Sequence, residues 1–264
     1  MNGGMYTMRL IVLLKPILNP DAIGFNPVRR ILTVSDREKF ICEDDKSAIE
    51  LALRWKEEMN AEVSALTFGD ETADVLLREA LSMGADSGIH ILMKEYEDVL
   101  SVSQKLADHL RTTEFDYLLT GFRCKNSAME CVGSLLAHRL DMEKINGVTQ
   151  IIRKGNRINV IQTTDHIRRT VGLPDRCMLG ISTTEAVRYM HASRIFGVYA
   201  SEKIMQIHPD RNENNESDIV GYDTRDRKKE MKVVEDSENN MLNESLRFLS
   251  DIGVLAKGKG GVTG

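Results

Sequence analysis

The chain has 264 residues, 42% of them hydrophobic and 28% charged, which is the balance of a folded protein with a substantial core. Its formal net charge of −5 and its 5% of aromatic residues argue against a nucleic-acid partner. No window approaches the roughly 18 apolar residues that a membrane span requires, so we expect no membrane insertion.

The first half of the chain alternates apolar runs with segments of helical periodicity. Met8 to Leu14 is a continuous apolar run, typical of a buried strand in a parallel sheet. Lys15 to Phe40 contains three prolines and little periodicity, and we interpret it as a long excursion. Further strands are predicted at 61–68, 89–93 and 115–120, and helices at 48–59, 73–81, 99–110 and 129–140. Such alternation predicts an α/β fold, a three-layer α/β/α domain with a mostly parallel sheet.

The pattern changes after Leu140. Short strands joined by polar turns are predicted at 148–153, 157–162, 168–171 and 177–182. The stretch RNENNESD (211–218) reads as a linker, and an amphipathic helix follows at 241–252. We therefore divide the chain into an α/β domain, residues 1–208, and a linker with a C-terminal arm, residues 209–264. Because the arm helix is isolated in the sequence, we expect it to pack on another chain.

The four cysteines lie far apart and show no metal-ligand spacing. The N-terminus, MNGGMYTMRL, lacks the pattern of a secretion or import signal. We therefore expect free thiols and a cytoplasmic location. The six histidines do not cluster and no GxSxG motif occurs, so zinc and hydrolytic sites have little support. The C-terminal KGKGGVTG is interpreted as a tail, because a phosphate-binding loop needs a following helix.

Two segments stand where a parallel sheet binds ligands. In LLTGFRCKNSAMECVGSLLAHRL (118–140) a strand runs into Gly121, which allows an unusual backbone turn, and then into a helix with Ser127 and Glu130 as a capping box. In CEDDK (42–46) an acidic helix start either complements the helix dipole or binds a ribose or adenine. Residue types alone leave the ligand of both segments unnamed.

Four segments, taken in order, carry a family pattern. They are MRLIVLLKPI (8–17), ICEDDKSAIELALRWKEE (41–58), VSALTFGDETADVLLREALSMGADSGIHI (63–91) and FDYLLTGFRCKNSAMECVGSLLAHRL (115–140). The series resembles the β subunit of electron-transfer flavoproteins, and ALSMGAD followed by LLTG is its most specific part. The similarity extends from Met8 to about His208, and more faintly into the arm.

The resemblance implies a β subunit of a heterodimer whose α subunit holds most of a redox FAD. It also implies that this chain binds a nucleotide itself, AMP or a second FAD. The residues expected by position to line that site are Leu13, Cys42, Asp44, Asp45, Phe68, Gly121, Phe122, Arg123, Cys124, Glu130, Cys131 and Val132. Such a subunit carries electrons between a dehydrogenase and an acceptor and has no catalytic residues of its own.

The sequence departs from the family pattern at several of these positions. The family's asparagine-proline is Cys42-Glu43, its glutamine-alanine is Arg123-Cys124, and its phosphate-binding helix start is 130–132, with a carboxylate at Glu130. The segment Arg188 to Phe196 resembles the family's partner-recognition loop, through which the dehydrogenase partner is expected to bind. His191 and Ala192 stand there in place of the family's leucine anchor.

Two alternatives stay open. A divergent β-type paralogue would form the same heterodimer in a structural role, without a bound nucleotide, because phosphate donors are lost around Glu130. A stand-alone nucleotide-binding α/β enzyme would require a glycine-rich loop after the first strand. Lys15 to Pro20 is not such a loop.

Overall fold

The structure is a computed structural model that describes residues 7–18, 23–34, 39–93, 98–123, 128–154, 157–164, 167–183, 186–199, 203–209 and 246–250. The chain divides into two units, residues 1–222 and 223–264. In the second unit residues 246–250 are helical, within the helix predicted at 241–252. The predicted linker and the KGKGGVTG tail lie outside the described residues, and the packing of the arm on another chain stays a prediction.

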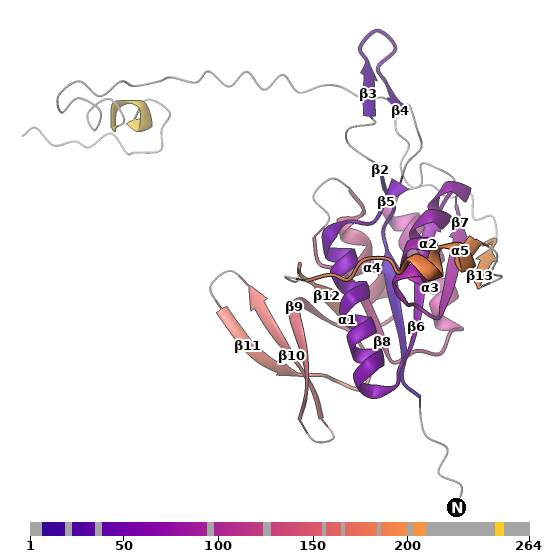
Figure 1. Ribbon diagram of the computed structural model, residues 1–264. Coiled ribbons are helices and arrows are strands. Elements are labelled where there is room, and N and C mark those ends of the chain that lie inside the picture. Colours follow the sequence, from indigo (N-terminus) through magenta and orange to yellow (C-terminus); the bar gives the residue numbers. More distant parts are fainter. Residues whose placement is uncertain are drawn as a thin grey trace, which may run out of the picture. The chain divides into compact units, whose positions relative to one another are not determined.

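The first unit contains a nine-stranded sheet in the order β11-β10-β9-β12-β8-β1-β6-β7-β13 (Figure 1). Its strands are β1 (Arg9–Leu14), β6 (Glu62–Gly69), β7 (Ser87–Leu92), β8 (Tyr117–Gly121), β9 (Glu143–Lys154), β10 (Arg157–Thr164), β11 (Ile167–Gly172), β12 (Cys177–Ile181) and β13 (Ile204–Ile207). The pairs from β13 to β9 are parallel, whereas β10 is antiparallel to both β9 and β11.

Helices cover both faces of the parallel part of the sheet. They are α1 (Glu43–Met59), α2 (Asp74–Met83), α3 (Val99–Arg111), α4 (Val132–Arg139) and α5 (Ala192–Tyr199), with short 3-10 turns η2 (Glu71–Ala73) and η3 (Ala128–Cys131). Strand β1 alternates between two cores: Leu10 and Val12 pack with α1 and α2, and Ile11 and Leu13 with α3 and α4. The predicted three-layer α/β fold is therefore confirmed.

The excursion from Lys15 to Phe40 contains strands that its weak periodicity did not predict. Strand β2 (Ile17–Leu18) pairs with β5 (Lys39–Phe40), and β3 (Ile23–Asn26) pairs with β4 (Ile31–Val34), both in antiparallel fashion. The side chain of Asn26 accepts hydrogen bonds from the backbone N–H groups of Val28 and Arg29, which stabilises the connecting turn.

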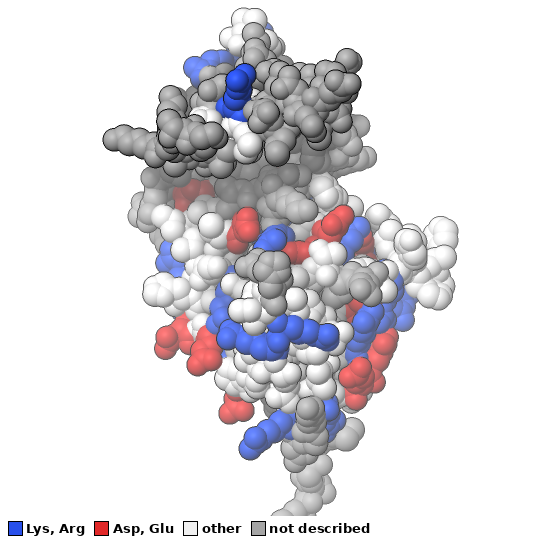
Figure 2. Space-filling model, turned by 90° about the vertical axis from the view of Figure 1, so that its left-hand side faces the viewer, with Lys and Arg blue, Asp and Glu red and all other residues white. Residues whose placement is uncertain are grey.

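Strand β9 is longer than the predicted strand at 148–153 because it has two partners. Its first residues pair in parallel with β12, and its later residues pair in antiparallel fashion with β10. Gly147, with a φ of 74°, lies where the strand changes partner. Figure 2 looks onto the side of the molecule formed by β9, β10 and β11, where Lys and Arg side chains lie across the middle of the face. Arg157 and Arg168 are exposed on these strands.

Candidate functional site

The chain order places a crevice at the carboxyl ends of β1 and β8. From β1 the chain builds β6 and β7 on one side, and after α3 it returns to place β8 on the other side of β1. Ligands of open α/β sheets bind at such a switch point, outside the carboxyl ends of the strands. The N-terminus of α1 lies at the same point, because Asp45 contacts the ends of both strands.

A buried ion pair between Lys15 and Asp45 occupies this crevice. The Nζ atom of Lys15 lies 2.5 Å from Oδ1 of Asp45, and the two side chains are 1% and 0% exposed. Nζ also donates to the hydroxyl of Thr120 at 2.8 Å, and the Asp45 carboxylate accepts from the backbone N–H of Gly121 at 2.6 Å. The pair therefore joins β1, β8 and α1. Asp45 is buried between these three elements.

Gly121 is required here for a reason other than the predicted turn. It continues β8, and among the described residues the glycines with positive φ are Gly69, Gly84 and Gly147. A Cβ atom at residue 121 would lie 2.7 Å from the backbone nitrogen of Asp45, closer than real Cβ contacts. The prediction of an unusual backbone conformation was wrong, and the glycine serves the close approach of α1 to β8.

Asp44, the neighbouring carboxylate, links α1 by hydrogen bonds to the segments that follow β8 and β12. It accepts a hydrogen bond from the backbone N–H of Arg123 at 2.9 Å and another from the hydroxyl of Thr183. It is buried, with 7% of its surface exposed. The acidic helix start thus forms specific tertiary contacts. The two interpretations drawn from the sequence, a role in the helix dipole and the direct binding of a ligand, did not include these contacts.

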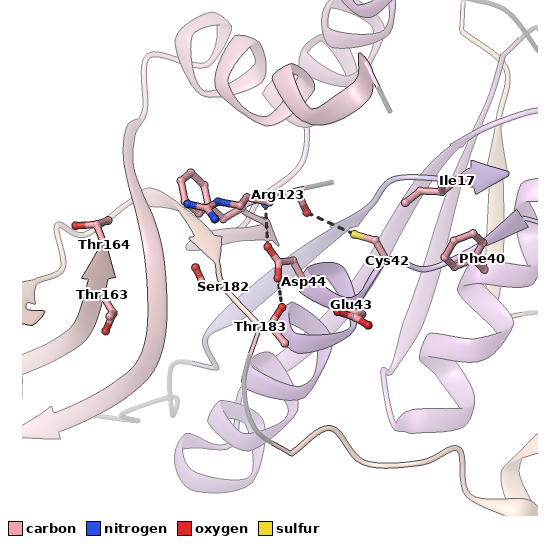
Figure 3. Close-up of a pocket in the computed structure, with 11 residues that line it drawn as sticks. Ile17, Phe40, Cys42, Glu43, Asp44, Arg123, Thr163, Thr164, Ser182 and Thr183 are labelled. Carbon is pink, nitrogen blue, oxygen red and sulfur yellow. Dashed lines mark hydrogen bonds between the residues drawn. The ribbon is translucent and has the colours of Figure 1, made fainter. Parts of the chain in front are cut away.

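A cavity of about 600 Å³ opens beside these contacts. Figure 3 shows Thr163 and Thr164 on one side of it, Phe40 and Ile17 on the other, and Arg123 with Asp44 between them. The full lining is Ile17, Phe40, Cys42, Glu43, Asp44, Phe122, Arg123, Thr163, Thr164, Ser182 and Thr183. The cavity thus offers apolar surface, hydroxyl groups, exposed Glu43 and the exposed guanidinium of Arg123, which suits a polar ligand with a planar part.

The structure brings some of the predicted site residues together and separates others. Those that line the cavity are Cys42, Asp44, Phe122 and Arg123. Those enclosed beneath it are Asp45 and Gly121. Those buried in the core under α3 and α4 are Leu13, Phe68 and Val132. Those exposed in η3 are Glu130 and Cys131. Cys124 lies outside the described residues, as does Ser127, so the predicted cap at Ser127 stays a prediction.

Lys144 is a cation near η3 that the sequence did not reveal. It lies on β9, and its Nζ donates to the hydroxyl of Ser134 in α4 at 2.9 Å. Burial and then the charge of Lys15 lower the pKa of Lys144 to about 8, while Glu130 acts in the opposite direction. A basic group therefore stands beside the first turn of α4, close enough to Glu130 to offset part of its charge.

The predicted partner loop is held on α1 by Arg188. Its guanidinium donates to Glu50 at 2.7 Å and to Glu57 at 2.6 Å, and its backbone N–H donates to Glu50 at 3.1 Å. The adjacent Tyr189 is 95% exposed, and Phe196 in α5 is 84% exposed. The loop therefore combines an anchored base with exposed aromatic side chains.

Within the described residues, no three His, Cys, Asp or Glu side chains gather as a metal site requires. None of the helices that the structure describes has the length and apolar character needed to cross a membrane. Cys42, Cys131 and Cys177 are not joined in disulfides.

Comparison with known proteins identifies a family whose profile matches this chain and several relatives of similar sequence. The profile of the electron transfer flavoprotein domain family matches residues 31–193. The chain is 24% identical over 223 residues to the electron transfer flavoprotein subunit beta of Thermoanaerobacterium thermosaccharolyticum, across 83% of this chain and 86% of that one. It is 28% identical to the acryloyl-CoA reductase electron transfer subunit gamma of Anaerotignum propionicum, across 73% and 75%. It is 25% identical to the caffeyl-CoA reductase-Etf complex subunit CarD of Acetobacterium woodii, across 77% and 79%.

Proposed function

The chain belongs to the electron transfer flavoprotein domain family, and from this membership we propose that it is the β-type subunit of a heterodimeric electron carrier. Electrons pass through FAD between a dehydrogenase and an acceptor, and an α-type subunit holds most of that FAD. The observation that carries the proposal is the family match together with relatives that are named as electron transfer subunits. The chain itself acts by binding and positioning.

The cavity beside Asp44 is the proposed nucleotide site of this chain. Its volume of about 600 Å³ is ordinary for a small-molecule site and suits a mononucleotide such as AMP. The guanidinium of Arg123 is the charged group that would meet a phosphate, and the hydroxyls of Thr163, Thr164 and Ser182 add hydrogen-bond donors. The exposed carboxylate of Glu43 would accept hydrogen bonds from ribose hydroxyls.

A second candidate is a divergent β-type subunit that binds no nucleotide and has a structural role. The exposed carboxylate of Glu130 in η3 favours it, because a carboxylate beside a phosphate costs about 1–4 kcal/mol at effective dielectric constants of 80 to 20. The buried pair of Lys15 and Asp45 favours it too, because that pair already fills the crevice. Lys144 and Arg123 weigh against it, because both are basic groups near the sites in question.

The test is co-expression of the full chain with its α-type subunit, followed by denaturation and chromatographic identification of the released nucleotides. We expect a yellow heterodimer that releases FAD and, in addition, about one equivalent of AMP or a second FAD. FAD without a second nucleotide would support the structural candidate. A stable, colourless chain that does not bind the α-type subunit would overturn the proposal.

A further inference from the structure

A second cavity, of about 440 Å³, lies at the opposite ends of the strands from the first. It is bounded by the end of α2, by Lys56 of α1, by α5 and by Lys203, which directly precedes β13. Its volume lies within the range of about 300–1,000 Å³ that is typical of small-molecule sites. We propose that this cavity is a binding site for a small organic anion, one that carries a phosphate or carboxylate group on an apolar body.

The charges of the lining favour an anion. Three side chains are cationic, namely Lys56, Arg194 and Lys203, and Asp86 is the carboxylate among the lining residues. Both oxygens of Asp86 are occupied, one by Nζ of Lys56 at 2.5 Å and the other by the backbone N–H of Val63 at 2.9 Å. Lys56 pairs with Asp86, whereas neither Arg194 nor Lys203 forms an ion pair with a carboxylate of the described residues.

Capping of α2 accounts for only part of this arrangement. Arg194 donates through Nη1 to the carbonyl of Met83 at 3.2 Å, and Lys56 donates to the carbonyl of Gly84 at 3.2 Å, as cations at a helix C-terminus commonly do. A guanidinium has five N–H groups, so Arg194 retains donors after this contact. Lys203 donates no hydrogen bond to this cap, and the capping contacts of Arg194 and Lys56 do not explain why a cavity is present beside them.

The floor and one wall of the cavity favour a ligand with an apolar part. Leu81, Ala85 and Val198 line it, each of them buried. Gly197 lines the cavity on α5, and apart from its own helix and chain neighbours no described atom lies within 4 Å of the position of a Cβ atom there. A bare helix wall over an apolar floor leaves room for a flat or aliphatic group beside the cations, which is the mixed lining that small-molecule sites show.

The test uses phenyl phosphate as the probe and the full chain, together with any subunit that copurifies, as the protein. Saturation-transfer NMR gives its Kd, with inorganic phosphate and phenol as the anionic and apolar halves. We expect saturable binding of phenyl phosphate that is at least tenfold tighter than that of either half. Gly197→Leu, which fills the wall, abolishes it, and Arg194→Gln weakens it about tenfold to hundredfold through loss of a charge-assisted contact.

The controls separate this cavity from the first and from the proposed electron-carrier role, on which the inference does not depend. Because the proposed nucleotide site could also take an aromatic phosphate, the comparison is made in the Arg123→Gln background, which removes the guanidinium of that site. If Gly197→Leu does not fold, Lys203→Glu replaces it, because Lys203 is exposed and its reversal is expected to weaken the probe at least tenfold. Absence of saturable binding, equal affinity for inorganic phosphate, unchanged binding in these cavity variants, or loss of binding in Arg123→Gln would each overturn the inference.

Discussion

Nζ of Lys15 and Oδ1 of Asp45 lie 2.5 Å apart at a point where neither side chain is more than 1% exposed. Removal of one partner from such a pair leaves a buried charge without compensation and costs about 3–5 kcal/mol. We therefore expect Lys15→Met to lower the free energy of unfolding by about that amount in urea denaturation of the purified chain. Asp45→Asn should also destabilise it, while keeping an acceptor for the N–H of Gly121.

The double variant Lys15→Met with Asp45→Asn is the control for this pair. Because both charges are then absent, it should be more stable than the sum of the two single changes predicts. Additive losses, or a loss of less than about 1 kcal/mol in Lys15→Met, would contradict a buried charge pair.

His90 gives the fold a dependence on pH. Its side chain on β7 is 0% exposed, and neither ring nitrogen has a hydrogen-bond partner in the described structure. Burial lowers the pKa of His90 below the ordinary value of 6.5, and it outweighs the backbone of Gly69 and the charge of Asp74, which act in the opposite direction. The unfolded chain therefore binds more protons in the acidic range.

Since the pKa of His90 is lowered by folding, its contribution is fully present above pH 6.5 and is lost as the pH falls below that value. We expect the free energy of unfolding to fall by up to about 1.4 kcal/mol per pH unit between pH 6.5 and the folded pKa. His90→Leu should reduce this slope in denaturation curves. Burial lowers the pKa of His109 as well, so His109→Gln should reduce the slope independently and the double variant should reduce it most. An unchanged slope in His90→Leu would contradict the assignment.

Arg188 is expected to hold the partner loop on α1. Burial acts to raise the pKa of Glu50, but hydrogen bonds from Arg188 and Arg54 outweigh it and keep that pKa below its ordinary value. Arg188→Gln should lower the free energy of unfolding by about 1.5–3 kcal/mol at pH 7. Because a lowered carboxyl pKa stabilises above pH 4.5, the difference from the parent should shrink as the pH falls through the folded pKa. A pH-independent difference would contradict the ion pair.

Tyr189 tests the docking role of the same loop without a change in stability. Its 95% exposure predicts that Tyr189→Ala alters the free energy of unfolding by less than about 0.5 kcal/mol. If the loop contacts the dehydrogenase partner, the variant should weaken that complex by about 1–2 kcal/mol, as truncation of an exposed aromatic anchor does. The readout is the dependence of electron-transfer rate on partner concentration. Ile167→Ala, at an exposed position of β11, is the matched control, and equal effects of both variants would contradict the prediction.

Lys144 and Arg123 allow the position of the proposed phosphate to be determined. Arg123→Gln should reduce nucleotide retention if the phosphate lies in the cavity beside Asp44, and Lys144→Met should do so if it lies at the first turn of α4. Retention is measured as nucleotide released per heterodimer, with Arg157→Gln, an exposed change on β10, as the control. We expect the larger loss in Arg123→Gln, and a loss confined to Lys144→Met would contradict that placement.

The layers of the fold could be predicted from the sequence because local patterns of apolar residues specify the strands and helices that form them. The apolar run of β1 and the helical stripe of α2, which ends at Gly84, were predicted within a few residues of the structure. The contacts of Asp44 and Asp45 were not, because their partners lie 30 to 139 residues away and depend on sheet order. Lys144 was missed for the same reason: its β9 neighbours look polar and irregular until β12 pairs with them.

Gly121 also has a consequence for variation of the sequence. The backbone of Asp45 lies against the position that a Cβ atom at residue 121 would take. Even alanine at residue 121 would therefore push the start of α1 away from β8. The displacement would separate the Asp45 carboxylate from the N–H of Gly121 and strain its contact with Lys15. In a library randomised at residue 121 and selected for stability alone, glycine should dominate the survivors. Residue 121 therefore limits how this chain can evolve, whatever ligand it binds.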